Sequence, residues 1–274
     1  MKISFEINED NIGIKDYLIK YYSFSFFGYL RETKARILCN GEEVFLNYFC
    51  KKGDIVEISY TPIKQGGLPS INPVSVLYED EYCLIIDKPF GVCTIPSIMH
   101  PEDAIYNRLL TYFGGSEYTI HFMTRLDKET AGLVLVCKSQ YAAAIFAKKN
   151  YRFDKYYYAD VVKPLENKEG LIDLPIKRSD DYRRIVVSDG RICKTEYRFI
   201  SQIDNHLFRY ELHLLTGRAH QIRVHLSYFG SSIYNDELYG IKEDDSYMHL
   251  QAYKIIFHHP ILHKDIEVIS KIKM

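Results

Sequence analysis

An arginine and an aspartate two positions apart are the residues of this chain best placed to do chemistry. Arg125 and Asp127 stand in the polar stretch TRLDKETAG, residues 124–132, which leads into the apolar run GLVLVCK. A carboxylate at the mouth of a buried strand is held firmly enough to act as a nucleophile or a base. A neighbouring guanidinium can bind an anion or stack on a base. Asp127 is therefore the first candidate for a catalytic group.

This stretch belongs to a series of five blocks along the chain. They are VLYEDEYCLIIDKPFGV (76–92), TRLDKETAGLVLVCKS (124–139), KYYYADV (155–161), LTGRAHQIRVHLSYFGSSIYNDELYG (215–240) and MHLQAYKIIFHHP (248–260). Their order and approximate spacing resemble the RluA/RluD family of RNA pseudouridine synthases. The resemblance covers roughly the last three-quarters of the sequence. It implies an enzyme that isomerises uridine in RNA to pseudouridine.

The implied reaction breaks the N1 glycosidic bond, turns the uracil and rejoins it through C5, without a metal or an organic cofactor. By the resemblance, Asp127 is the catalytic aspartate, which either attacks C1′ or removes the 2′ proton to give a glycal. Tyr157, within the pattern K-x-Y-x-A, resembles the tyrosine that stacks on the uracil and takes part in deprotonating C5. Arg223, in HQIRVH, resembles the basic residue paired with the aspartate, where a cation keeps the carboxylate ionised.

Four further residues are candidates for binding the substrate. A uridine stacked in an RNA helix must be extruded before it can react, and Arg125 is the candidate wedge that fills the vacated place. Arg218, His220 and Gln221, in the block GRAHQIR, are expected to hold phosphates or to shape the pocket. The family usually has a histidine immediately before the arginine of Arg125, whereas this chain has Thr124. This departure leaves the Arg-x-Asp spacing intact.

Each candidate also has an interpretation without catalysis. Asp127 could cap a turn, Tyr157 is one of 24 tyrosines, and Arg223 could form a surface ion pair of little energetic value. The histidines at 220, 225, 258 and 259 could suggest a metal site, but no Glu or Cys completes a ligand set beside them, so we expect no metal. The joint occurrence of the motifs in order favours the catalytic interpretation.

Composition limits the class of protein. A chain of 274 residues that is 47% hydrophobic can bury a full core. The six cysteines have no CxxC spacing and lie mostly in apolar runs, which predicts free thiols in a reducing cytosol. No apolar run approaches the roughly 20 residues that span a bilayer, so we expect a soluble cytoplasmic monomer without membrane contact. A net charge of −1 is unusual for a nucleic-acid binder, and RNA contacts must then come from local basic clusters and from shape.

The sequence predicts two domains joined by a linker. Residues 63–73 lie in TPIKQGGLPSINP, whose glycines and prolines are typical of a linker. Residues 1–62 read as two helices followed by short strands, with a hairpin at Asn40 and Gly41, and resemble the small S4-like module placed ahead of many RluA/RluD enzymes. An RNA-binding role and a mere packing role both stay open for this module. Residues 74–274 form the expected catalytic domain.

The catalytic domain reads as α+β, with a mixed, mainly antiparallel sheet. Its expected strands are short β-branched or aromatic runs at 83–87, 132–138, 156–162, 183–187, 196–200, 207–215, 249–257 and 266–270. Two helices are expected between them, over 104–112 and over 140–149 with Ser139 as N-cap. The segment KKNYRFDKYYY, residues 148–158, interleaves cations and rings. It is either an RNA-contacting surface or the solvated end of a helix leading into an edge strand.

The sequence therefore predicts an RNA pseudouridine synthase, with 23S ribosomal RNA as the first substrate candidate and tRNA as the second. A non-catalytic RNA-binding or ribosome-assembly protein on the same fold is the alternative, motivated by Thr124 and by the near-neutral charge. The retention of Asp127, Tyr157 and Arg223 together argues against this alternative, because a pure binder has no need of all three.

Overall fold

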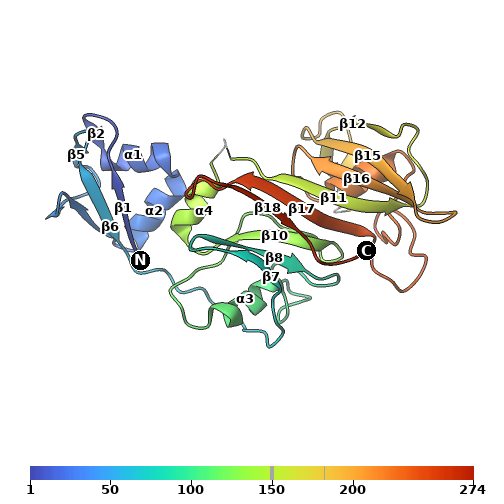
Figure 1. Cartoon of the computed structure of the whole chain (residues 1–274), viewed down its shortest axis with the longest axis horizontal. Helices are drawn as coiled ribbons and strands as arrows, with labels where there is room; N and C mark the ends of the chain where they lie inside the picture. The colour runs from blue at the N-terminus through green and yellow to red at the C-terminus, as the bar shows by residue number, and fades with distance from the viewer. Residues whose placement is uncertain (149–150, 182) are drawn as a thin grey trace.

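The protein is elongated, with a small N-terminal unit at one end of a large sheet (Figure 1). The computed structural model describes residues 1–148, 151–181 and 183–274. Within these residues, no helix is both long enough and apolar enough to cross a bilayer.

The N-terminal unit contains two helices packed on a small antiparallel sheet. Its helices are α1 (Ile14–Tyr21) and α2 (Phe24–Glu32), and its sheet has the order β1-β6-β3-β4. The strands are β1 (Lys2–Glu6), β3 (Arg36–Cys39), β4 (Glu42–Glu43) and β6 (Ile55–Ser59), with β2 (Ile12–Gly13) and β5 (Phe49–Cys50) paired separately. The predicted hairpin is confirmed, since Asn40 and Gly41 both have positive φ, as a two-residue I′ turn requires.

The small unit shares its hydrophobic core with a helix of the rest of the chain. Tyr141 and Ala144, on α4 (Gln140–Phe146), pack into the N-terminal core, and the Tyr141 ring lies 6.0 Å from that of Phe26. Lys148 Nζ donates a hydrogen bond to the carbonyl oxygen of Lys20 at 2.7 Å. Figure 1 shows α4 between the two units. The shared core fixes the small unit against the larger one.

Residues 60–75 contain no helix or strand, as expected of the predicted linker. The segment is nevertheless attached to the surface. Gln65 donates to the carbonyl oxygen of Ile120 and accepts from its N–H, at 3.0 and 2.6 Å.

The larger unit is built on a mixed, mainly antiparallel sheet of ten strands, which confirms the α+β class. Its order is β12-β15-β16-β11-β17-β10-β8-β7, with β18 added on β17 and β9 on β10, and only β10 and β17 are parallel among the described pairs. The strands are β7 (Val76–Glu79), β8 (Cys83–Lys88), β9 (His121–Phe122), β10 (Ala131–Cys137), β11 (Asp154–Val161), β12 (Glu169–Asp173), β15 (Lys194–Gln202), β16 (Phe208–Leu214), β17 (Leu250–His258) and β18 (Asp265–Ile269). A separate hairpin pairs β13 (Ile176–Arg178) with β14 (Arg184–Val186).

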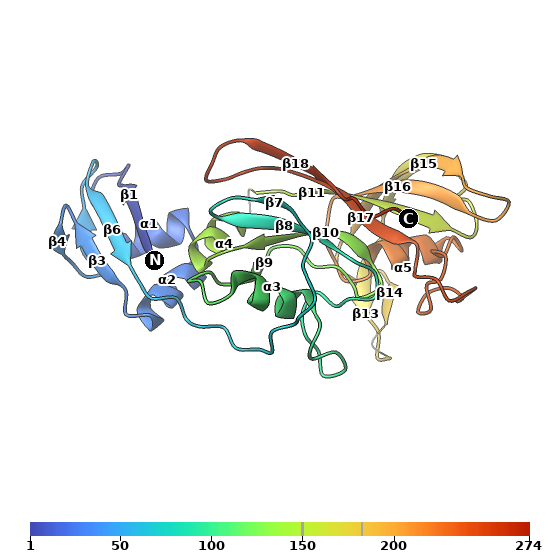
Figure 2. The same cartoon turned by 60° about the horizontal axis from the view of Figure 1, so that its bottom comes forward.

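Both faces of the central strands are covered, which explains their continuous apolar runs. On β8, Leu84 and Ile86 belong to the core cluster that includes α3 (Ile105–Phe113) and α5 (Gln221–Tyr228), whereas Cys83 and Ile85 pack on the side of α4. Figure 2 shows α3 and α5 on the same side of the sheet.

Several details of the sequence prediction need correction. It contained no counterpart of the strands β1, β7, β12 and β13. The described part of the larger unit contains three helices rather than two, because α5 was not predicted. The helix α4 is shorter than predicted and ends at Phe146, while Lys149 lies outside the described residues. The strand β11 pairs with both β16 and β17, so the segment 148–158 does not lead into an edge strand. The predicted N-cap is confirmed, because Ser139 Oγ accepts a hydrogen bond from Ala142 N–H.

Gly132 is required where β10 passes β17. It has a φ of 112°, and a Cβ at this position would lie 2.1 Å from the carbonyl oxygen of Ala252. Only glycine permits both this backbone conformation and this close approach. The loop of residues 124–130 therefore enters β10 at a fixed point of the sheet.

Candidate active site

All seven residues predicted from the sequence line one cavity of about 530 Å³. Arg125 and Asp127 come from the loop between β9 and β10, and Tyr157 comes from β11. The other four come from the loop after β16 and from α5; they are Arg218, His220, Gln221 and Arg223. The cavity thus joins three segments that are far apart in sequence.

The loop that carries Asp127 is held by two threonines. Thr94 Oγ1 donates to the carbonyl oxygen of Leu126 at 2.7 Å and accepts from its N–H at 3.2 Å. Thr124, at the position where the family has a histidine, is buried, and its Oγ1 accepts a hydrogen bond from Leu135 N–H at 2.9 Å. Thr124 therefore anchors the loop to β10.

Lys88 is a further support of this loop that the sequence interpretation did not single out. Its side chain is fully buried, and its ammonium donates to the carbonyl oxygens of Pro89, Val92 and Lys128 at 2.7–3.0 Å. Burial lowers the pKa of Lys88 to about 7. The ammonium ties the end of β8 to the segment that follows Asp127.

Arg223 is held between two carboxylates. Its Nε and Nη2 bind Asp236 at 2.8 and 2.7 Å in a bidentate pair, and its Nη1 donates to Asp127 Oδ2 at 3.2 Å. The Asp236 side chain has no exposed surface, whereas that of Asp127 is 33% exposed and faces the cavity. Asp236 thus fixes the guanidinium, and the guanidinium in turn fixes the Asp127 carboxylate.

His220 also lies beside Asp127, near the same carboxylate oxygen that Arg223 binds. Its Nδ1 forms a hydrogen bond of 2.8 Å with the Tyr239 hydroxyl, and its Nε2 is 3.7 Å from Asp127 Oδ2. Burial lowers the pKa of His220, although the charge of Asp127 opposes this shift. The Tyr239 ring also lies 5.1 Å from the Arg223 guanidinium. The segment NDELYG therefore supplies Asp236 and Tyr239 as supports for the two basic residues beside Asp127.

Tyr157 is buried in the cavity wall, with 6% of its surface exposed. The pairing of β11 with β17 shifts register between Tyr156 and Tyr157, and such a bulge redirects a side chain. Burial, and next the charge of Asp127, raise the pKa of the Tyr157 hydroxyl well above its usual value. The phenol is therefore protonated at neutral pH.

Gln221 and the two exposed arginines differ in their surroundings. The Gln221 amide accepts from Thr216 Oγ1 and from Arg218 N–H, and it donates to Thr195 Oγ1 and to the carbonyl oxygen of Lys194, all at 2.9–3.0 Å. These bonds hold the loop that precedes α5, so Gln221 shapes the cavity. Arg125 and Arg218 are exposed at its rim.

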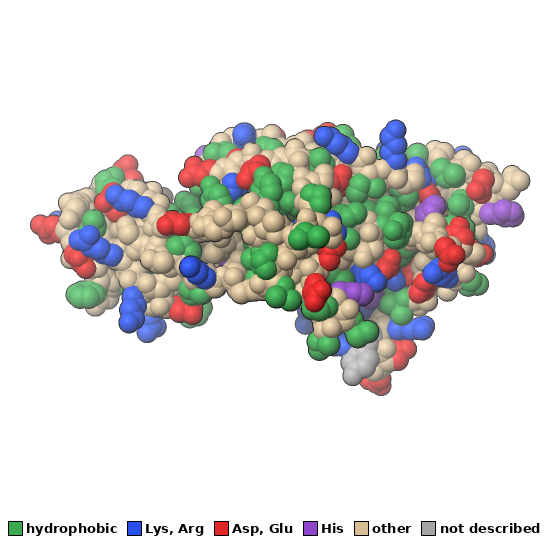
Figure 3. All heavy atoms as spheres, turned by 90° about the horizontal axis from the view of Figure 1, so that it is seen from below, with side chains coloured by type: hydrophobic (Ala, Val, Ile, Leu, Met, Phe, Trp, Pro, Cys, Tyr) green, Lys and Arg blue, Asp and Glu red, His purple; other side chains and the backbone are tan. Residues whose placement is uncertain are grey.

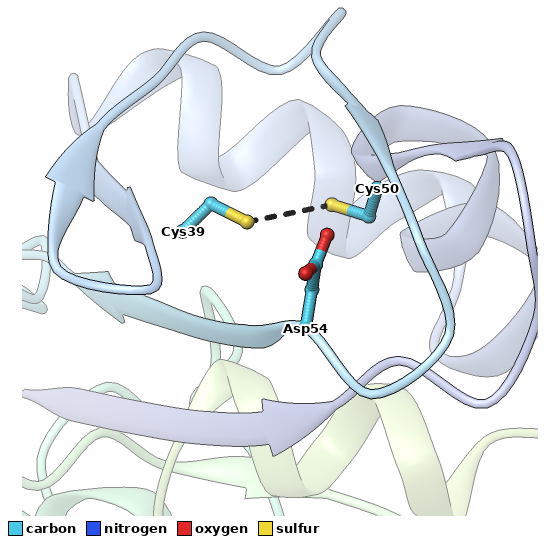
Figure 4. A group of neighbouring side chains, drawn as sticks. All are labelled: Cys39, Cys50 and Asp54. Carbon is cyan, nitrogen blue, oxygen red and sulfur yellow. Dashed lines mark hydrogen bonds between the residues drawn. The ribbon is translucent and has the colours of Figure 1, made fainter.

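Two groups of potential metal ligands occur among the described residues, and both lie outside this cavity. Figure 4 shows the first, in which the Cys39 and Cys50 sulfurs are 3.9 Å apart beside Asp54. The Asp54 carboxylate already accepts hydrogen bonds from Asn40 Nδ2 and Lys51 N–H. The second group consists of Asp80, Cys83 and His259. All six cysteines are free thiols, as the sequence predicts.

The chain belongs to the RNA pseudouridylate synthase family, whose model matches residues 82–228. An uncharacterized RNA pseudouridine synthase of Bacillus subtilis (strain 168), YjbO, is 35% identical over 231 residues, which are 81% of each chain. The ribosomal large subunit pseudouridine synthase D of Zymomonas mobilis is 32% identical over 71% of this chain and 64% of its own. The human RNA pseudouridylate synthase domain containing 1 shares the fold, with a TM-score of 0.61 at 22% identity, over 77% of this chain and 86% of its own. The protein is thus an RNA pseudouridine synthase.

Proposed function

We propose that this enzyme isomerises a uridine of 23S ribosomal RNA, with Asp127 acting at the sugar. The observation that carries the proposal is the Arg223–Asp127 contact of 3.2 Å in a cavity that Tyr157 also lines. Two relatives named ribosomal large subunit pseudouridine synthase D, at 32% and 33% identity, favour the large-subunit RNA as substrate.

In the proposed reaction the carboxylate of Asp127 either attacks C1′ or removes the 2′ proton, and the N1–C1′ bond breaks. Arg223 holds the carboxylate by its hydrogen bond and directs it into the cavity. The uracil turns against the ring of Tyr157 and bonds to C1′ through C5, as the C1′–Asp127 ester breaks or, in the glycal route, as Asp127 returns the proton to C2′. The C5 proton then leaves with the participation of Tyr157, whose phenol must first pass its own proton to a base, and N1 takes up a proton, so that the product is an isomer of the substrate.

The test uses purified protein, a transcript of 23S ribosomal RNA and a pool of tRNA. Pseudouridine is located by its carbodiimide adduct, which stops reverse transcriptase. We expect a new stop in the ribosomal transcript. A stop found only in tRNA would reject the ribosomal substrate and favour the tRNA alternative, and the absence of any stop in either RNA would reject both.

We infer that the N-terminal unit is an S4-like RNA-binding module. Lys15 and Arg31 lie 5.8 and 6.0 Å from the ring of Phe27, beside the exposed Phe24, so cations and rings interleave on its helices. On the face of the protein that Figure 3 shows, Lys and Arg side chains are scattered among acids rather than gathered into one patch. We therefore expect the contacts with RNA to come from local groups of cations and rings, such as the one that Lys15 and Arg31 form with Phe27.

Arg125 is proposed to fill the place of the extruded uridine. It is exposed at the cavity rim, two residues before Asp127. We expect Arg125→Ala to slow the reaction most on an RNA whose target uridine is stacked in a helix, because only that substrate must meet the unstacking cost of a few kcal/mol. Rates on matched stacked and unpaired RNAs give the ratio. Equal losses on both would mean that Arg125 holds a phosphate or positions the loop.

Removal of metal ions is expected to leave activity unchanged. The proposed rearrangement is redox-neutral and needs no Lewis acid to activate water. Protein treated with EDTA should keep its rate on an RNA that folds without magnesium. A loss that added zinc restores would contradict this expectation.

A further inference from the structure

Lys155 lines the cavity but has no role in the reaction proposed above. It opens the K-x-Y pattern on β11, two positions before Tyr157, and both side chains line the cavity. The side chain is half-buried, and its ammonium forms no hydrogen bond or ion pair with any described residue. Burial lowers the pKa of Lys155.

Buried lysines elsewhere in this protein are satisfied by protein groups. Lys88 donates to three carbonyl oxygens, and Lys138 binds Glu79 Oε1 at 2.8 Å and the carbonyl oxygen of Asp80 at 2.7 Å. The Lys155 ammonium, by contrast, is not among the buried polar atoms that lack a partner, so it keeps contact with solvent in the cavity. Lys155 therefore differs from the structural lysines of the same chain, because its ammonium faces the cavity without a partner among the described residues and can contact a ligand there.

The surroundings of Lys155 suit an anion. Asp127 is the one carboxylate among the described lining residues, and it is already paired with Arg223. Arg218 lies on the same wall. Gly217 leaves room for the ammonium, because a Cβ at this position would lie 3.1 Å from Lys155 Nζ. The helix α5 begins shortly after this loop, and its N-terminal end adds a partial positive charge.

We propose that Lys155 binds a backbone phosphate adjacent to the extruded uridine. This inference rests on the proposed function and adds a positioning contact to it. With C1′ of the target at Asp127, the phosphates on either side of that sugar are the anions that enter with the substrate. The ammonium is attracted to one of them, and this contact sets the position of the sugar relative to the carboxylate.

The test removes the two charges separately and together. Lys155→Gln and the unaltered protein are each assayed on RNA with ordinary phosphates, and on RNAs with one neutral methylphosphonate 5′ or 3′ of the target uridine. We expect either change alone to lower kcat/KM about tenfold to a hundredfold, the effect of losing one charge-assisted hydrogen bond. When the methylphosphonate replaces the phosphate that Lys155 binds, Lys155→Gln and the methylphosphonate together should lower kcat/KM no more than either change alone, since coupled groups are non-additive.

A matched control is Lys163→Gln, which removes one exposed lysine just beyond the end of β11. It should change kcat/KM by less than about twofold, the expectation for an exposed charge away from the site, and should retain the full methylphosphonate penalty. Thermal unfolding of Lys155→Gln should match that of the unaltered protein, because no internal bond is lost. If the effects of Lys155→Gln and of the methylphosphonate on kcat/KM multiply at both phosphates, the inference is wrong.

A failure of the Lys155 inference can be distinguished from a failure of the proposed function. If the unaltered protein modified tRNA and left 23S RNA untouched, the proposed substrate would be wrong. The same charge comparison on tRNA would then decide the role of Lys155.

Discussion

Asp127→Asn is expected to abolish pseudouridine formation while leaving the protein folded. The amide can neither attack C1′ nor remove a proton, and loss of a reacting group typically costs about 10⁴-fold or more in rate. The shape of the side chain is unchanged, and Arg223 keeps its bidentate pair with Asp236 at 2.7–2.8 Å. Tritium release from RNA that contains uridine labelled at C5 measures the loss.

The control for this substitution is Asp180→Asn, an exposed aspartate of the β13–β14 hairpin loop. It makes the same chemical change away from the cavity and should retain activity. The affinity of Asp127→Asn for RNA should stay within a few-fold of that of the unaltered protein, because the carboxylate itself repels phosphates. Appreciable turnover by this variant would refute the assignment of Asp127 as the group that acts at the sugar.

Arg223→Gln should lower both stability and activity. The substitution leaves Asp236 as a carboxylate with no exposed surface and no cation. Breaking a buried ion pair from one side costs about 3–5 kcal/mol of unfolding free energy. Asp127 also loses the contact that directs it into the cavity. The midpoint of urea unfolding and the rate of tritium release should therefore both fall.

The double variant Arg223→Gln, Asp236→Asn separates the two effects. Neutralising both partners removes the uncompensated charge, and the new Oδ1 can still accept from the N–H groups of Leu238 and Tyr239. Most of the lost stability should return, whereas activity should not. A double variant that regains activity would show that Arg223 serves the fold alone. An Arg223→Gln midpoint equal to that of the unaltered protein would contradict the ion-pair argument.

The sequence located the candidate site but not its supports. Asp127 and Arg223 are 96 positions apart and meet at 3.2 Å, and their pairing was expected from the motif blocks. Asp236, Tyr239 and Lys88 lie inside the same blocks. Their roles depend on which polar groups become neighbours in the folded chain, and the spacing of residues in the sequence does not encode this. That the Lys155 ammonium has no partner among the described residues is likewise visible only after its surroundings are known.

The missed elements have different causes. The helix α5 begins at Gln221, after the N-cap residue His220, which has a positive φ of 58° and makes no side-chain cap, so the usual signals of a helix start are absent. Its sequence QIRVHLSY contains β-branched and aromatic residues that also suit a strand. The strand β1 has the sequence KISFE, whose polar and apolar residues alternate as in a half-buried strand, so its signal is present in the sequence although the prediction for residues 1–62 began with the helices. In the folded protein, pairing with β6 makes β1 a strand, and packing against the rest of the fold makes α5 a helix.

Mapping of pseudouridines in cellular RNA tests the central claim most directly. Total RNA is compared from cells that lack this gene and carry a plasmid with the unaltered gene, the Asp127→Asn gene or no insert. We expect at least one pseudouridine in 23S ribosomal RNA that appears with the unaltered gene and with neither of the other plasmids. Identical pseudouridine maps in all three strains, or a site that Asp127→Asn restores in full, would contradict the central claim.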